Sequence, residues 1–286
     1  MRRLLGLGDN TVDLYLTTGL MYPGGNAVNV AALSARLGET ASYLGVVGQD
    51  APGDLVLRAL RHEGVDVTRC RQVPGSTSWS KVVHRGTDRT FTGSDLGVST
   101  RWELTLDDFD FVSAHDVTHV SLYSGLNDLL PRIREAAPRL SFDFSSEWTD
   151  AHLEDVAPLL DVAFLSAAEH DERGCVELAR RVERLGARVV VVTRGEHGAL
   201  AVTGGEPTFV AAEPADVVDT LGAGDAFIAA FLNVWLDRGD LPSALRAGAR
   251  EAARNCATLG AFGHGTPITP DGDLVFAEDP GLRNAR

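Results

Sequence analysis

The residues best suited to chemistry lie in one short stretch, Asp219 to Phe227, which reads Asp-Thr-Leu-Gly-Ala-Gly-Asp-Ala-Phe. The small residues Gly222, Ala223 and Gly224 let a large group approach the backbone, and apolar residues then follow at helical spacing. The free amides and the dipole at the start of a helix favour an anion, most often a phosphate. Because the carboxylate of Asp225 would repel a phosphate, we interpret Asp225 as a base that deprotonates a hydroxyl attacking phosphorus.

A second candidate motif lies near the N-terminus, where Gly24 and Gly25 precede a helical pattern. Paired glycines allow the backbone to approach a ligand closely. Asn26 has the residue type of a helix N-cap. Asn29 falls inside an apolar helical face, where a buried amide needs partners, and a sugar hydroxyl is one such partner.

Two carboxylates, Asp9 and Asp13, come directly after the first strand-like segment. Ligands of open α/β sheets bind beyond the carboxyl ends of the strands, so Asp9 is predicted to reach the pocket. Asp13 is expected either to bind the ligand together with Asp9 or to lie on the surface.

Composition narrows the function classes. The chain has 286 residues and a formal net charge of -14, so we expect neither nucleic acid nor an acidic membrane as a partner. Its three cysteines are scattered and show no metal or disulfide spacing. No signal peptide or membrane-spanning run is recognisable, and we expect a cytoplasmic protein.

Strand-like and helix-like segments alternate along the chain, which predicts an α/β three-layer sandwich around a mostly parallel sheet. We treat residues 1–286 as a single domain. The predicted strands are Leu4–Leu7, Ala41–Val47, Val117–Val120, Leu140–Phe144, Val162–Leu165 and Val189–Thr193. The predicted helices include Ala27–Leu37, Gly53–Glu63, Leu126–Ala136, Cys175–Leu185 and one near Leu245–Leu259.

Residues 11–22 and 76–95 break this rhythm, and they predict a small β-sheet that projects from the domain. Residues 266–286 are rich in Pro, Asp and Gly, and they are expected to form a loosely packed tail or an edge strand.

The two motifs together resemble the signatures of the ribokinase (PfkB) family of carbohydrate kinases. The resemblance implies a ribokinase-like fold in which Asp225 is the base and the amides around Gly222–Gly224 stabilise the transferred group. It also implies that Gly24, Gly25 and Asn29 line the sugar site and that Asp9 binds sugar hydroxyls. In this family the small sheet is a lid that often mediates dimerisation, and an arginine at the position of Arg89 closes over the substrate.

The same resemblance implies an ATP site. Thr193, Gly195 and Gly198 match a Thr-x-Gly-x-x-Gly turn that holds ATP, and the region of Asn255 flanks the adenine. Glu169 retains the acidic end of an Asn-x-x-Glu motif whose first position is Ser166 here, which implies Mg²⁺ bound through water. A monovalent cation, K⁺, is implied near Asp219.

Several segments resemble the fructoselysine 6-kinase branch, among them residues 8–15, 24–30 and 142–148. The hypothesis is transfer of the ATP γ-phosphoryl group to the 6-hydroxyl of fructoselysine or a related fructosamine. Kinases of fructose, ribose, ketodeoxygluconate or nucleosides share these core motifs and remain alternatives, as does a non-catalytic sugar or nucleotide sensor. A Rossmann dehydrogenase is disfavoured, because Gly6 and Gly8 lack the third glycine of its fingerprint.

Overall fold

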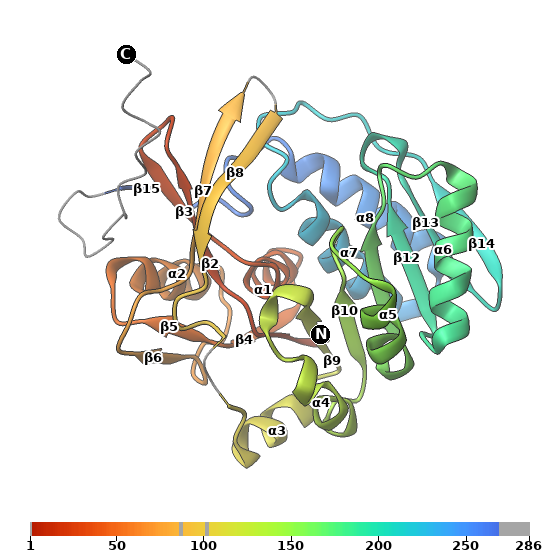
Figure 1. The fold of residues 1–286 in the computed structure, drawn as a ribbon, viewed down its shortest axis with the longest axis horizontal. Helices are drawn as coiled ribbons and strands as arrows, with labels where there is room; N and C mark the ends of the chain where they lie inside the picture. The colour runs from red at the N-terminus through yellow and green to blue at the C-terminus, as the bar shows by residue number, and fades with distance from the viewer. Residues whose placement is uncertain (1, 86–87, 101–102, 269–286) are drawn as a thin grey trace.

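An eight-stranded sheet forms the centre of the computed structural model, which describes residues 2–85, 88–100 and 103–268 (Figure 1). Six neighbouring strands are parallel, and the two strands at one edge pair antiparallel. In spatial order the strands are β14 (Glu206–Val210), β13 (Ala199–Thr203), β12 (Val189–Thr193), β11 (Val162–Ser166), β10 (Leu140–Asp143), β9 (Val117–Ser121), β1 (Arg3–Leu7) and β4 (Thr40–Leu44).

Helices cover both faces of this sheet and make the predicted three-layer sandwich. Alternation along β12 sorts its side chains, since Val189 and Val191 join one apolar cluster while Val190 and Val192 join the other. The first cluster contains residues of α1 (Asn26–Arg36), α2 (Ala51–His62), α7 (Ala223–Arg238) and α8 (Leu241–Asn255). The second contains residues of α3 (Leu106–Ser113), α4 (Leu130–Ala136), α5 (Asp150–Val156) and α6 (Glu172–Leu185).

A separate five-stranded sheet contains the two segments that were expected to form one. Its order is β15 (Thr266–Pro267), β3 (Leu20–Gly24), β2 (Thr11–Tyr15), β7 (Trp79–Arg85) and β8 (Asp88–Asp95). The β7–β8 hairpin projects away from the main sheet (Figure 1). Of the predicted tail, Thr266–Pro267 pairs with β3, while residues 269–286 lie outside the described residues.

The structure departs from the sequence-based expectation at several elements. The β13–β14 hairpin was not predicted, although its turn, Gly204-Gly205, is a hairpin signal and both residues have positive φ, 62° and 78°. Helices α3 and α5 were also missed. The predicted strand over residues 41–47 divides at Gly45 into β4 and β5 (Val46–Gly48), and β5 pairs with β6 (Arg71–Val73). No helix in the described ranges is both long and apolar enough to cross a bilayer.

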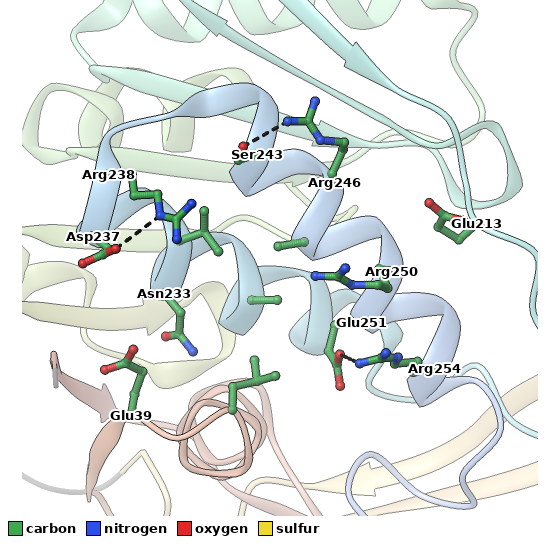
Figure 2. Close-up of a pocket in the computed structure, with 14 residues that line it drawn as sticks. Glu39, Glu213, Asn233, Asp237, Arg238, Ser243, Arg246, Arg250, Glu251 and Arg254 are labelled. Atoms are coloured by element: carbon green, nitrogen blue, oxygen red, sulfur yellow. Dashed lines mark hydrogen bonds and ion pairs between the residues drawn. The ribbon is translucent and has the colours of Figure 1, made fainter.

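A cavity of about 590 Å³ opens on the outer side of α7 and α8, away from both sequence motifs. Charged side chains of both signs line it, among them arginines on successive turns of α8 (Figure 2). Arg238 and Arg254 pair with the neighbouring carboxylates of Asp237 and Glu251 at 3.4 Å each. Since opposite charges largely balance here and no predicted site residue lines this space, we do not assign it a catalytic role.

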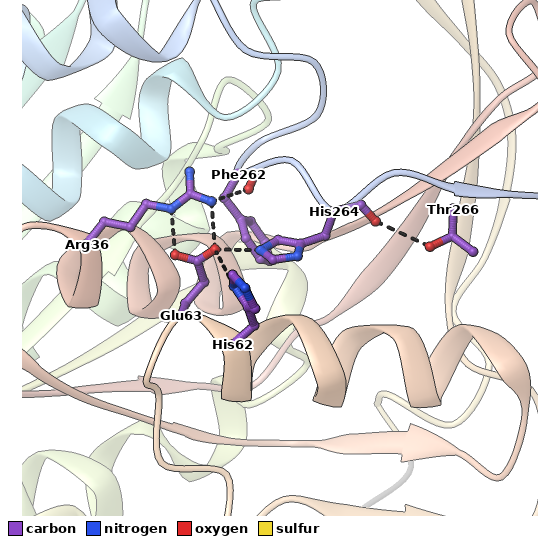
Figure 3. A network of polar contacts seen from close by, with 6 residues as sticks. All are labelled: Arg36, His62, Glu63, Phe262, His264 and Thr266. Carbon is purple, nitrogen blue, oxygen red and sulfur yellow. Dashed lines mark hydrogen bonds and ion pairs between the residues drawn. The ribbon is translucent and has the colours of Figure 1, made fainter.

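A polar network joins α1, α2 and the segment that leads into β15 (Figure 3). The carboxylate of Glu63 accepts hydrogen bonds from Arg36 at 2.6 and 2.7 Å and contacts Nε2 of His264 at 2.5 Å. Arg36 also donates to the carbonyl of Phe262. The network therefore fastens the start of the C-terminal segment, and with it the edge of the second sheet, to the helical layer.

This network predicts a pH-dependent contribution to stability. Burial raises the pKa of Glu63, but hydrogen bonds from Arg36 and His264 outweigh burial and hold this pKa below its ordinary value of 4.5. A carboxyl with a lowered folded-state pKa stabilises the fold above the unfolded pKa, and this contribution is lost as pH falls. We expect Glu63→Gln to lower the melting temperature near neutral pH by about 2–4 °C for each kcal/mol lost.

In thermal melts, the difference between wild type and Glu63→Gln should shrink as pH falls from about 5 to about 3. The matched control is Glu177→Gln, which breaks an exposed pair with Arg173 on α6 and should change the melting temperature little. A melting-temperature difference that is the same at both ends of that pH range would contradict the assignment.

Candidate active site

A second cavity, of about 510 Å³, lies where the carboxyl ends of the parallel strands meet the five-stranded sheet. Parallel strands that end at the same edge bring distant residues together, which is why ligands bind there. The cavity is lined by residues after β1 and at the end of β10, by the first turns of α1 and α7, and by residues of β2, β7 and β8. Of the predicted site residues, it brings together Asp9, Asp13, Gly25, Asn29 and Asp225.

The carboxylate of Asp225 is held by two amides from the neighbouring helix. Nδ2 of Asn26 donates to Oδ1 of Asp225 at 2.8 Å, and Nδ2 of Asn29 donates to Oδ2 at 2.6 Å. The interpretation of Asn26 as an N-cap is wrong, because Gly25 is the N-cap of α1 with φ of 102°. The glycine frees Asn26 to enter the first turn and to direct its side chain at the carboxylate.

Asn26 also binds a second carboxylate. Its Nδ2 donates to Oδ2 of Asp143 at 2.9 Å, while Oδ1 of Asp143 accepts from the backbone N–H of Ser145 at 2.9 Å. Burial, reinforced by the charges of Asp225 and Asp9, raises the pKa of Asp143 to about 7 against the effect of these hydrogen bonds. Ser145 has φ of 53°, an unusual value for a non-glycine residue that often marks a functional site. The cavity thus holds two carboxyl groups that share one amide donor.

Two further carboxylates, Asp9 and Asp13, line the cavity. Oδ1 of Asp9 accepts hydrogen bonds from the hydroxyls of Ser121 at 2.7 Å and Ser124 at 2.8 Å, which fix its position after β1. Asp13 on β2 is 3% exposed, so it is not a surface residue. Gly24 makes room for it, since a Cβ at position 24 would lie 2.3 Å from Oδ2 of Asp13.

The electrostatic character of the cavity is acidic. Five of its lining residues are carboxylates, and the described residues that line it include no lysine or arginine. The carboxylates are Asp9, Asp13, Asp143, Glu147 and Asp225. Such a surface favours a ligand that carries hydrogen-bond donors or a positive charge.

Two buried amide oxygens of this cavity lack a hydrogen-bond donor among the described residues, Oδ1 of Asn10 and Oδ1 of Asn29. The amide nitrogen of Asn10 is engaged with Tyr43 and the carbonyl of Val46 at 2.9 and 2.7 Å, which fixes the direction of the group. Buried acceptors are normally satisfied, so these two oxygens are suited to the hydroxyls of a bound sugar.

The turn before α7 has the geometry of an anion site. Gly222 is the N-cap of α7 with φ of 77°, no side chain caps the helix, and a Cβ at position 222 would lie 2.5 Å from Ala261. Gly224 in the first turn is exposed, and a Cβ there would meet nothing within 4 Å. Ala223 lies between them as the first residue of α7. The open space beside the helix start suits a phosphate.

Two buried side chains hold this turn in place. The carboxylate of Asp219 accepts from the backbone N–H groups of Leu221 at 2.9 Å and Gly260 at 3.0 Å, and from the hydroxyl of Tyr15. Asn255 donates to the carbonyl of Leu221 at 3.1 Å. Asn255 is the last residue of α8, which begins and ends about four residues earlier than predicted.

The remaining candidates lie outside the cavity. Thr193 ends β12, and its hydroxyl lies 3.2 Å from that of Ser166 at the end of β11. Gly195 and Gly198 bound a one-turn 3₁₀-helix with positive φ, 57° and 84°. Glu169 is exposed and precedes α6, whose first residue is Glu172. Arg89 lies on β8 opposite His84 of β7 in the antiparallel strand register. The side chain of Arg89 lies outside what the structure describes.

Sequence reasoning missed several polar residues of this site. Ser121 and Ser124, which hold Asp9, follow the end of a predicted strand, and that position was the available signal. Tyr123 and Ser145 line the cavity and share a hydrogen bond of 3.0 Å. Tyr123 lies in a 3₁₀-helix, Leu122–Ser124, and Ser145 follows the end of β10, so neither position carried a signal of its own. His119 lies within a strand, and nothing in its spacing indicated a role.

The sequence of this chain is similar to those of known carbohydrate kinases. Residues 5–263 match the family model of pfkB family carbohydrate kinases. The chain is 40% identical over 269 residues to fructosamine kinase FrlD of Bacillus subtilis (strain 168), covering 93% of this chain and 94% of that protein. It is 35% identical over 262 residues to fructoselysine 6-kinase of Escherichia coli (strain K12), covering 92% of this chain and 100% of that protein.

Solved structures show the same architecture. The structure of Arabidopsis thaliana ribokinase complexed with ribose and ATP has a TM-score of 0.78 and 21% identity, covering 91% of this chain and 94% of that one. A putative ribokinase II from Escherichia coli in complex with ATP and Mg²⁺ also has a TM-score of 0.78, at 20% identity, covering 92% and 95% of the two chains. The fold is therefore ribokinase-like, and the chain belongs to the PfkB family of carbohydrate kinases.

Proposed function

We propose that this protein transfers the γ-phosphoryl group of ATP to the 6-hydroxyl of a fructosamine, with fructoselysine as the best candidate. One observation carries the proposal: the Asp225 carboxylate lies in the first turn of α7 and lines an acidic cavity sized for a small molecule. The relatives named above, a fructosamine kinase and a fructoselysine 6-kinase, support this substrate class.

In the proposed reaction, Asp225 takes the proton of the acceptor hydroxyl as its oxygen attacks the γ-phosphorus. The bond from that phosphorus to the bridging oxygen breaks, and ADP leaves with the electron pair. The amides at Gly222, Ala223 and Gly224 stabilise the charge that develops on the transferred group. Asn26 and Asn29 hold the carboxylate in one orientation, so that reorganisation during proton transfer is small.

The nucleotide is proposed to extend from this turn toward Thr193, Gly195 and Gly198, with Asn255 holding the turn. Mg²⁺ bound with ATP would neutralise charge on the phosphates, and Glu169, an exposed carboxylate beyond the end of β11, is suited to bind its water. Asp219 is poorly placed to coordinate K⁺ directly, because both of its carboxylate oxygens already accept hydrogen bonds. A role for K⁺ therefore stays a prediction from the family resemblance.

The acidic cavity favours a fructosamine over an uncharged sugar. An Amadori product carries a secondary ammonium group at the carbon next to its ketose ring, whereas fructose and ribose carry hydroxyls alone. Carboxylates in a partly buried cavity attract such a cation. Sugar hydroxyls would donate to the acceptors of Asp9, Asn10 and Asn29, and Arg89 would close over the substrate from the β7–β8 hairpin.

Two further expectations remain predictions. The five-stranded sheet is proposed to act as a lid that excludes water, and it is the surface through which a homodimer would form. The cytoplasm remains the predicted location.

A substrate panel tests the proposed activity. ATP consumption should be largest with fructoselysine and lower by about tenfold or more in kcat/KM with fructose, ribose and ketodeoxygluconate, since losing a partly buried ion pair with the substrate costs about 1.4 kcal/mol or more, a factor of ten. Phosphorylation should map to the 6-hydroxyl. Preference for an uncharged sugar would favour another branch of the family, and nucleotide binding without turnover of any sugar would favour a sensor.

The variant Asp225→Asn tests the proposed base. It should keep the fold and the KM for ATP, while kcat falls by about 100-fold or more, the usual scale for a lost general base. The matched control is Asp237→Asn, at the exposed far end of the same helix, and it should leave kcat unchanged. A kcat of Asp225→Asn within a few-fold of wild type would remove Asp225 from the mechanism.

The two glycines of the turn should respond differently to substitution. Because a side chain at Gly224 meets nothing within 4 Å, Gly224→Val should keep the melting temperature yet raise the KM for ATP by about tenfold or more by filling the anion site. Gly222→Ala should instead destabilise the protein, because its backbone is left-handed and the new Cβ would overlap Ala261. Normal ATP kinetics in a stable Gly224→Val protein would place the phosphates elsewhere.

A further inference from the structure

His119 lies at the centre of β9 and is completely buried, yet both of its ring nitrogens have side-chain partners. Nδ1 lies 2.9 Å from the hydroxyl of Ser141 on β10, and Nε2 lies 2.8 Å from Oδ1 of Asn26 on α1. The ring therefore connects the middle of the main sheet to the amide that binds the carboxyl groups of Asp143 and Asp225.

The donor and acceptor types of the groups fix the direction of each hydrogen bond from Ser141 through His119 to Asn26. The carboxylate of Asp225 accepts from Nδ2 of Asn26, so the group of Asn26 that faces the cavity is its NH₂, and Oδ1 of Asn26 faces His119. That oxygen can only accept, so Nε2 of His119 donates. Burial lowers the pKa of His119 to about 3, which leaves a neutral ring whose Nδ1 accepts from Ser141.

We propose that His119 is a positioning residue: by donating from Nε2 to Asn26, it holds the amide in the one orientation that binds both Asp143 and Asp225. This inference rests on the proposed role of Asp225 as the base. His119 lines no part of the cavity and acts only through Asn26.

Loss of the Nε2 donor would leave Oδ1 of Asn26 buried without a partner. Such an oxygen is costly inside a protein, and the amide would turn to find a donor. A turned amide presents its oxygen to two carboxylates, so Asp225 loses the hydrogen bond from Asn26, while the one from Asn29 remains. The expected effect is a lower kcat with little change in the KM for ATP.

A matched pair of substitutions separates donation from packing. Gln and Met have similar lengths and volumes, but only Gln ends in an N–H donor. We expect His119→Gln to keep kcat within about fivefold of wild type and His119→Met to lower it by about tenfold to a hundredfold, the scale of one hydrogen bond to a charged group. If His119→Gln and His119→Met lose kcat equally, or if His119→Met has the higher kcat, the Nε2 donor does not matter and His119 only fills space in the core.

A double-mutant cycle tests whether His119 acts through Asn26. When Asn26→Ala is already present, adding His119→Met should cost almost nothing more in kcat, because coupled residues are not additive. Additive losses would overturn the proposal. The control is His115→Met, which removes another buried histidine, bonded to Phe111 and Ser42, and should lower the melting temperature without a selective loss of kcat.

The outcomes also separate this inference from the proposed function. All variants are measured with the best substrate of the panel, beside thermal melts that confirm folding. If wild type turns over no sugar, the proposed function fails and the role of His119 fails with it. If wild type is active and Gln and Met behave alike, only the role of His119 is lost.

Discussion

One amide group organises the candidate active site. The NH₂ of Asn26 donates to carboxylates from two elements that are far apart in the sequence, Asp143 at the end of β10 and Asp225 in α7. Without this bridge, two acidic groups would face each other in a partly buried space, where like charges repel strongly. The position of α1 against the sheet and against α7 is therefore also a condition for the position of the proposed base.

Backbone features at the starts of two helices help the fold to meet this condition. Gly25 and Gly222 are the N-caps of α1 and α7, and both have a positive φ that glycine adopts readily. The first turns of both helices lie at the same cavity. The first turn of α7 combines a carboxylate with free space beside Gly224. An anion site and a base thus lie within one turn, as transfer of a phosphoryl group to a hydroxyl requires.

Much of this organisation was predictable from sequence, because it depends on local patterns. Alternating strands and helices indicated the parallel sheet, and short motifs indicated Asp9, Asn29 and Asp225 as cavity residues. Contacts between distant segments were not predictable. Asn26 looked like a helix cap because its true partners lie 117 and 199 residues away. His119 carries no local signal, since its function depends on which strands become neighbours in the sheet.

The most direct test is a crystal structure of the wild-type protein with fructoselysine and an unreactive ATP analogue. The account predicts that a carboxylate oxygen of Asp225 lies within about 2.6–3.2 Å of the 6-hydroxyl, with the terminal phosphate beside Gly224. If the 6-hydroxyl instead contacts Asp143 and lies out of reach of Asp225, Asp225 is not the base and the account is wrong.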